Sequence, residues 1–205
     1  MFKNNYLHSV RDQYTADNLS RIGIKNVINT NCVTLWGLDT TCAEIPIRKA
    51  NSVVTTVTGY MNEKAQDVFM FNLLQELYDN VYFWPQGSKD LEYVKTIVSL
   101  DKVKVLDRSL DAYERTLELP EIDYVGSRLH GGIYALRHIR RTIIIAVDNR
   151  AREIHRDTGI PVIESADVRK DLKNLILSEW PTNVRLNTEA ADLWTEALRS
   201  RIKGI

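Results

Sequence analysis

Residues 142–147 of this 205-residue chain read Thr-Ile-Ile-Ile-Ala-Val, with no alternation of polar and apolar side chains. A strand of this kind is buried on both faces, as in a parallel sheet that helices cover from both sides. Strand-like and helix-like segments alternate along almost the whole chain, and helices between successive strands imply βαβ units. The sequence therefore predicts an α/β fold with a Rossmann-like, doubly wound parallel sheet.

The alternation gives eight expected strands and eight expected helices. The strands are expected at residues 6–10, 27–29, 52–58, 81–84, 103–106, 122–126, 142–147 and 162–163. The helices are expected at residues 13–22, 64–80, 90–99, 110–117, 129–138, 150–158, 167–177 and from Thr188 onward. Residues 38–50 show neither pattern, and we interpret them as a linker between a leading β-α-β piece and the main domain.

Charge is balanced overall but uneven along the chain. There are 27 basic and 27 acidic residues, which argues against a general nucleic-acid binder. Residues 128–156, however, hold seven arginines, no lysine and two acids, and seven minus two leaves this segment at +5. Three of the four histidines lie there too. This segment is therefore predicted to bind an anion.

Several other classes of protein are disfavoured by what the sequence lacks. Cys32 and Cys42 have no metal-knuckle spacing, and we interpret both as small, semi-buried residues. No apolar run approaches the roughly 18 to 20 residues that span a bilayer, and the start lacks the apolar core of a signal peptide, so we expect a cytoplasmic protein. P-loop, G-x-G-x-x-G, His-Glu-x-x-His and G-x-S-x-G motifs are absent, and a dedicated metal site is not expected.

The most informative junction is at residues 124–132, Tyr-Val-Gly-Ser-Arg-Leu-His-Gly-Gly, where a strand leads into a helix. Ligands of open parallel sheets bind beyond the carboxyl ends of the strands, and a helix N-terminus favours an anion. Gly131 and Gly132 would let the backbone approach that anion. Arg128 can fork onto a carboxylate or phosphate, and His130 can exchange a proton near neutral pH. The alternative is that Arg128 forms a surface salt bridge and His130 caps the helix.

A second junction follows the strand at residues 142–147. Asp148 or Asn149 would cap the next helix, and Arg150 would project from its first turn. Because Asp and Asn are the commonest caps, a purely structural role is the favoured interpretation here. The pair Arg11–Asp12, at the end of the first strand, is likewise expected to be a local structural pair.

A third junction, residues 83–88, reads Phe-Trp-Pro-Gln-Gly-Ser. Gln86 and the Ser88 hydroxyl would hold sugar hydroxyls, and Trp84 would stack on a sugar ring. The alternative is a turn that simply ends an aromatic strand.

Five stretches together resemble one family, the polysaccharide pyruvyl transferases. They are residues 124–133 (YVGSRLHGGI), 140–151 (RRTIIIAVDNRA), 9–12 (SVRD), 29–36 (NTNCVTLW) and 81–87 (VYFWPQG). The resemblance implies transfer of pyruvate from phosphoenolpyruvate onto two hydroxyls of a sugar, which gives a ketal and releases phosphate, in cell-surface or exopolysaccharide biosynthesis. It also implies no metal and no cofactor besides this donor substrate, and a fold similar to GT-B glycosyltransferases, in which two Rossmann-like halves face a cleft.

Carried over residue by residue, the resemblance matches Arg128 and His130 to the family's essential Arg and His, which we expect to be catalytic. Arg11 matches an Arg at the end of the first half, and Asp148 and Arg150 match an Asp-Asn-Arg stretch. The expected substrate-binding residues are Arg11, Gln86, Ser127, Gly131, Gly132, Asp148, Asn149 and Arg150.

The resemblance also suggests a division of the chain. Residues 1–46 are expected to be the last β-α-β piece of an N-terminal Rossmann-like domain, residues 47–186 a Rossmann-like C-terminal domain, and the helix within 187–205 to pack back on the first piece. Family members carry more of the N-terminal domain before Ser9, so self-association or a separate N-terminal-domain partner is an expectation. Two alternatives stay open: a truncated, inactive anion-binding remnant, and a GT-B nucleotide-sugar glycosyltransferase.

Overall fold

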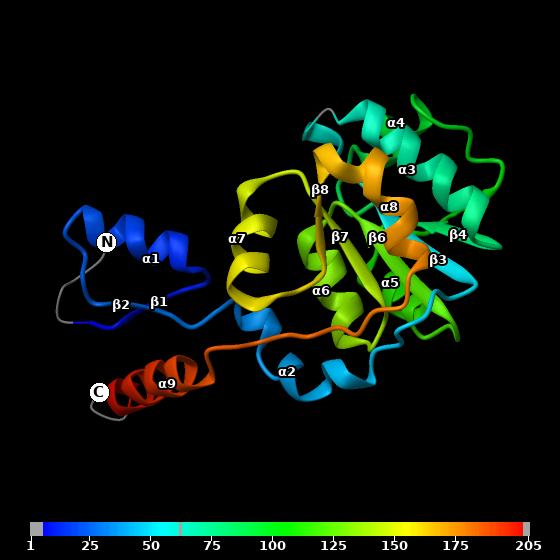
Figure 1. The fold of residues 1–205 in the computed structure, drawn as a ribbon. Helices are drawn as coiled ribbons and strands as arrows, with labels where there is room; N and C mark the ends of the chain where they lie inside the picture. Colours follow the sequence, from blue (N-terminus) through cyan, green and yellow to red (C-terminus); the bar gives the residue numbers. More distant parts are fainter. Residues whose placement is uncertain (1–5, 62, 203–205) are drawn as a thin grey trace.

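The computed structural model describes residues 6–61 and 63–202 (Figure 1). The strands are β1 (His8–Val10), β2 (Val27–Asn29), β3 (Ser52–Thr56), β4 (Asn80–Phe83), β5 (Val103–Val105), β6 (Ile122–Gly126), β7 (Thr142–Ala146) and β8 (Val162–Glu164). The α-helices are α1 (Gln13–Arg21), α2 (Leu38–Thr41), α3 (Lys64–Leu77), α4 (Asp90–Lys95), α5 (Leu110–Leu117), α6 (Leu129–Arg137), α7 (Asn149–Thr158), α8 (Val168–Leu177) and α9 (Thr188–Ile202). Short 3-10 turns are η1 (Val33–Leu35), η2 (Cys42–Glu44), η3 (Gly59–Met61) and η4 (Ser165–Asp167). No helix within these residues combines the length and apolarity that crossing a membrane requires.

Within the described residues, six parallel strands form the main sheet, in the order β5-β4-β3-β6-β7-β8. The chain builds outward from β3 through β4 to β5, and then restarts at β6 on the other side of β3 and builds outward to β8. This reversal makes the junction of β3 and β6 the topological switch point of the sheet. The order confirms the predicted doubly wound, Rossmann-like α/β fold.

Helices cover both faces of the sheet, and β7 contributes side chains to both cores. Ile144 and Ala146 belong to the apolar cluster beneath α6 and α7, whereas Ile143 and Ile145 belong to the cluster beneath α3 and α8. Each of these four side chains is at most 4% exposed. This two-sided burial is the physical reason why the strand shows no alternation of polar and apolar residues.

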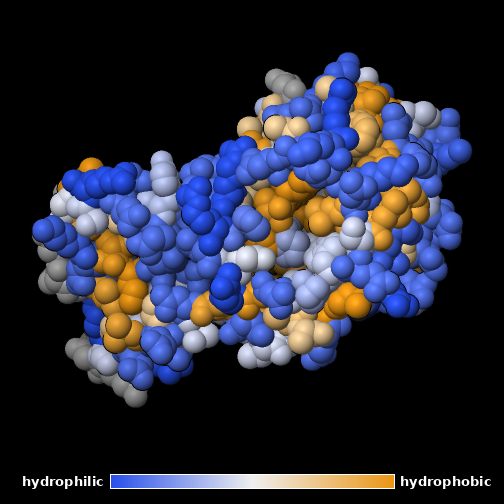
Figure 2. Space-filling model, viewed as in Figure 1, coloured by the Kyte–Doolittle hydropathy of each residue, from blue (hydrophilic) through white to orange (hydrophobic). Residues whose placement is uncertain are grey.

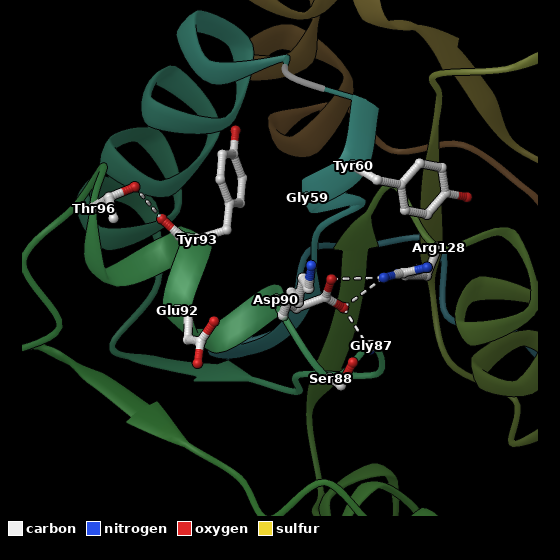
Figure 3. A pocket seen from close by; sticks show the side chains of 10 residues that line it. Gly59, Tyr60, Gly87, Ser88, Asp90, Glu92, Tyr93, Thr96 and Arg128 are labelled. Carbon is white, nitrogen blue, oxygen red and sulfur yellow. Dashed lines mark hydrogen bonds and ion pairs between the residues drawn. The ribbon is translucent and has the colours of Figure 1, made fainter.

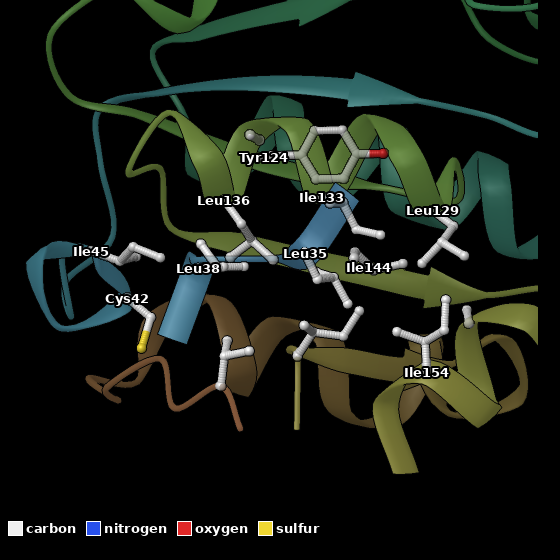
Figure 4. Close-up of a cluster of buried hydrophobic side chains, with 14 of the residues drawn as sticks. Leu35, Leu38, Cys42, Ile45, Tyr124, Leu129, Ile133, Leu136, Ile144 and Ile154 are labelled. Atoms are coloured by element: carbon white, nitrogen blue, oxygen red, sulfur yellow. The ribbon is translucent and has the colours of Figure 1, made fainter. Parts of the chain in front are cut away.

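The interpretation of residues 38–50 as a linker is wrong for the first half of that stretch. Residues 38–44 form α2 and η2, and Leu38, Cys42 and Ile45 are buried. These three side chains pack in the same apolar cluster as Leu136 of α6 and Ile144 of β7 (Figure 4). Their spacing is helical, but two turns are too short to stand out in a sequence pattern.

The first strands and the last helix form a smaller unit beside α7 (Figure 1). β1 and β2 pair in parallel, α1 connects them, and α9 packs against β2. The backbone N–H of Asn187 donates to Asn31 Oδ1 at 2.6 Å, and the rings of Trp36 and Trp194 meet edge to face at 6.4 Å. We call residues 6–36 the N-terminal unit. Its assignment to a separate domain stays a prediction.

Candidate functional site

Two neighbouring cavities open at the carboxyl ends of β3, β4 and β6. The smaller, of about 90 Å³, is lined by Thr58, Tyr60, Gln86, Ser127, Arg128, Leu129, His130 and Arg150. The larger, of about 600 Å³, shares Tyr60 and Arg128 with it. The smaller cavity therefore brings together five residues that the sequence predicted for the site: Gln86, Ser127, Arg128, His130 and Arg150.

The end of β6 is held against β3 by close backbone packing and buried hydroxyls. A Cβ on Gly126 would lie 2.7 Å from the backbone N of Thr56, so only glycine permits this approach. Beyond it, Ser127 Oγ lies 3.0 Å from Thr58 Oγ1, which in turn donates to the Ser127 carbonyl. Ser127 itself is buried. These contacts fix the direction in which the chain enters α6.

Arg128 is clamped from two sides and keeps one nitrogen available. Its Nη2 donates to both carboxylate oxygens of Asp90 at 2.6 and 2.7 Å, and its Nε donates to the Val57 carbonyl at 2.8 Å (Figure 3). Asp90 is 2% exposed, so this is not a surface salt bridge. Within the described part of the chain, Arg128 Nη1 has no hydrogen-bond partner. Arg128 can thus meet an anion through Nη1 while Asp90 and Val57 hold the rest of the guanidinium.

The loop before α4 leaves room for this clamp. Gly87 N–H donates to Asp90 Oδ2 at 2.6 Å, and a Cβ on Gly87 would lie 2.5 Å from Arg128 Nη2. A side chain at this position would therefore displace the guanidinium from its carboxylate.

The N-terminus of α6 faces the same cavity without a side-chain cap. The first backbone N–H of the helix to find a partner is that of Gly132, which donates to the Arg128 carbonyl. Among the residues described, the N–H groups of Leu129, His130 and Gly131 have none. Unpaired N–H groups at a helix start attract negative charge.

The two glycines of α6 serve packing. A Cβ on Gly132 would lie 2.4 Å from Ile144 Cγ1, and one on Gly131 would lie 3.2 Å from Tyr124 Oη. Both residues are buried, and neither is among those lining the two cavities. Gly132 lets α6 lie close to β7. Whether either glycine contacts a substrate stays a prediction.

His130 is exposed and has a partner that the sequence did not indicate. Its Nε2 lies 3.7 Å from the sulfur of Cys32, which is buried. Burial raises the pKa of the Cys32 thiol, but hydrogen bonds with His130 and Thr34 outweigh it and lower that pKa to about 7. The prediction of a semi-buried Cys32 captured its burial and missed this contact. The two residues stand 98 positions apart, so no local motif reveals it.

Arg150 and Asp148 form a tight pair at the start of α7. Asp148 caps the helix by accepting from the Arg150 N–H at 2.9 Å, and it also accepts from Arg150 Nε at 2.9 Å. Burial acts to raise the pKa of Asp148, but the bonds to Arg150 outweigh it and lower that pKa. Arg150 Nη2 reaches Tyr60 Oη at 3.3 Å. The predicted cap is present, Arg150 also lines the cavity, and Asn149 is exposed and lines neither cavity.

Two expected site residues lie elsewhere. Arg11 donates from Nε to Asp12 at 3.2 Å, as expected for a local pair, and lines neither cavity. Trp84 is buried, stacks on Tyr113 at 4.1 Å and donates to the Ser109 carbonyl. The hypothesis that Trp84 stacks on a sugar ring is therefore wrong, because its ring belongs to the core. Ser88 does line the larger cavity.

Across residues 6–61 and 63–202, no three side chains of His, Cys, Asp or Glu gather closely enough to hold a metal ion. The smaller cavity is lined instead by cations, hydroxyls, amide groups and one imidazole. This set can bind a small anion and move a proton beside it.

A family model described as polysaccharide pyruvyl transferase matches residues 1–149, which include the whole span from β1 to the first residue of α7. Arg128 and His130 lie inside the matched range, and Arg150 lies one residue beyond it. No curated protein matches the chain.

Proposed function

Because the chain belongs to the polysaccharide pyruvyl transferase family, we propose that it moves pyruvate from phosphoenolpyruvate onto two hydroxyls of a sugar. The product is a ketal of a cell-surface polysaccharide or exopolysaccharide. One observation carries the proposal: Arg128, His130 and the uncapped start of α6 meet at one cavity, at the switch point between β3 and β6. A cytoplasmic location stays a prediction.

Phosphoenolpyruvate suits the charges of this cavity. It carries a carboxylate and a phosphate on three carbons, so it needs two sites for negative charge close together. The free N–H groups of α6 with Arg128 Nη1 provide one, and Arg150 provides the other. Ser127 and Gln86 line the same cavity and can bind substrate oxygens.

The reaction needs an acid–base group, and we assign that role to His130. The C2 carbon of the donor forms bonds to two sugar oxygens and loses its bond to the phosphate oxygen. The two hydroxyls release two protons, of which one joins the methylene carbon to make a methyl group and the other leaves on phosphate. An exposed imidazole beside the anion site can carry one of these protons.

The test is phosphate release from phosphoenolpyruvate in the presence of a panel of saccharides. We expect His130→Ala to lower kcat by roughly a hundred- to ten-thousand-fold, the usual contribution of acid–base catalysis. His155→Ala is the matched control, because His155 is also exposed but lies in the second half of α7, outside both cavities. Near-normal turnover of His130→Ala would overturn the assignment.

The same assay separates the proposal from its rivals. A thermal shift with phosphoenolpyruvate and no phosphate release with any saccharide would indicate an anion-binding protein without activity. Turnover of a nucleotide sugar would indicate a glycosyltransferase.

A further inference from the structure

The His130 side chain belongs to the six-stranded part of the molecule, but the group it touches comes from the N-terminal unit. Cys32 directly follows the loop after β2 and precedes η1. Its sulfur lies 3.7 Å from His130 Nε2 and 3.1 Å from Thr34 Oγ1. The sulfur thus has two polar partners although the residue is only 8% exposed.

Contacts that do not involve His130 fix the sulfur in place. Cys32 O accepts from the Leu35 N–H at 2.8 Å, and the Leu35 side chain is fully buried in the cluster beneath α6. On α6, Arg137 Nη1 donates to the carbonyls of Thr34 and Trp36 at 3.3 and 3.0 Å. Because α6 itself holds the segment that carries Cys32, the sulfur and the imidazole keep a constant relation to each other.

The surroundings favour a negative sulfur. Arg137 anchors the Cys32 segment, and Arg128 and Arg150 line the cavity with His130. Tyr60 is a further titratable group lining that cavity, and Asp148 is paired with Arg150. The Cys32 pKa of about 7 agrees with this arrangement.

We propose that Cys32 is a positioning residue for His130, whose Nε2–H donates to the sulfur so that the ring is held in place. This rests on the function proposed above. Within the described residues, His130 Nδ1 has no hydrogen-bond partner, so Nδ1 is the nitrogen left to face the substrate. From this fixed position, Nδ1 exchanges a proton with the sugar hydroxyl, the methylene carbon or the leaving phosphate.

The pair itself is tested without any substrate, by following the ultraviolet absorbance of the thiolate against pH. We expect a step near pH 7 in the wild type that is lost in Cys32→Ala. In His130→Ala the step should move toward the ordinary thiol value of about 8.5. Cys42→Ala is the matched control, because Cys42 is also buried but its thiol contacts the Asp39 carbonyl. A step that His130→Ala leaves in place would overturn the pair.

A second measurement tests the role of the pair in turnover. We expect Cys32→Ala and Cys32→Ser each to lower kcat about tenfold, part of what acid–base catalysis supplies, with KM little changed. The loss should fall on kcat and not on KM, because the sulfur holds the ring without touching the substrate. A normal kcat in both variants would overturn the positioning role. If the thiolate titrates as expected but the wild type releases no phosphate with any saccharide, the pair stands and the proposed function fails.

Discussion

Asp90 fixes the most important cation of the site at the cost of burying a charge. Its two oxygens accept from Arg128 Nη2 and from the Gly87 N–H, and it is 2% exposed. Buried ion pairs contribute little net stability, because desolvation offsets their attraction. The Asp90–Arg128 pair instead fixes the orientation of the guanidinium, so Arg128 presents Nη1 in one direction only. Asp90 and Asp148 neutralise the formal charges of Arg128 and Arg150, so the free N–H groups at the start of α6 must contribute the remaining attraction for a dianion.

A second buried carboxylate near the larger cavity makes stability depend on pH. Asp67 of α3 is 5% exposed and accepts from Tyr93 Oη of α4 at 2.7 Å. Burial raises the pKa of Asp67 to about 6, with Glu63 and Asp90 adding to the rise and the Tyr93 bond opposing it. Between about pH 4 and 6 the folded chain therefore holds a proton that the unfolded chain has lost, so stability falls as pH rises through this window.

We expect Asp67→Asn to remove this dependence while keeping an acceptor for Tyr93. The variant should exceed the wild type in free energy of unfolding by about 3 kcal/mol at neutral pH, from the two-unit rise in pKa, and the difference should shrink below about pH 6 and vanish below about pH 4. Urea unfolding of both proteins across this range measures the difference. A gap that stays constant with pH would show that Asp67 is ionised at the same pH in the folded and unfolded chains.

At the scale of elements, the position of α6 against the sheet determines the geometry of the site, because the first turn of α6 carries His130. The adjacent glycines give a matched pair of variants. In Gly132→Ala the new Cβ meets buried Ile144 at 2.4 Å, whereas in Gly131→Ala it meets Tyr124 Oη at 3.2 Å. Both variants gain about 1 kcal/mol of helix propensity, so we expect overpacking to decide: Gly132→Ala should cost about 1 to 3 kcal/mol and Gly131→Ala less, because its new Cβ is less crowded.

Thermal and urea unfolding of these two variants distinguish packing from helix propensity. Equal stabilities would mean that α6 moves away from β7 without cost. In that case the close contact between Gly132 and Ile144 would not determine the position of α6 against β7.

The same scale shows which features a sequence can predict. β7 was predicted because burial on both faces removes alternation, and the start of α7 because Asp148 is a common helix cap. The prediction for Trp84 was wrong because an aromatic side chain at the end of a strand can either bind a sugar ring or pack in the core. Only the stacking of Trp84 on Tyr113 shows that it packs in the core. The pairing of Cys32 with His130, and of Asp90 with Arg128, depends on how distant elements pack, so no local pattern contains it.

For the whole molecule, the question is how the N-terminal unit stays aligned with the sheet. Its outer side is covered by α9, and Figure 2 shows apolar side chains gathered over the region between β1–β2 and α9. On the other side, Asp157 of α7 accepts from Gln13 N–H and from Asn29 Nδ2 at 2.7 and 2.9 Å. Since this unit delivers Cys32 to His130, its alignment belongs to the chemistry as well as to stability.

Asn31 is the residue where this alignment can be tested. It is 4% exposed, has a φ of 59°, and accepts from the Asn187 N–H just before α9. Asn31→Ala removes the acceptor and puts alanine in a left-handed backbone that asparagine tolerates better, whereas Asn31→Gly removes the acceptor without backbone strain. We expect Asn31→Ala to be less stable than Asn31→Gly by about 1 kcal/mol, and both to lie below the wild type by about 1 kcal/mol or more.

Hydrogen exchange locates the effect of these variants. Amides at the start of α9 should exchange faster in both than in the wild type, because the bond to Asn187 is lost in each, while α3 on the far side of the sheet should be unchanged. If Asn31→Ala and Asn31→Gly were equally stable, the left-handed backbone would carry no cost at this position. If exchange in α9 did not respond, Asn187 would not be what ties the last helix to the N-terminal unit. Faster exchange accompanied by a weaker Cys32 thiolate signal would show that α9, through Asn31, supports the geometry of the His130 site.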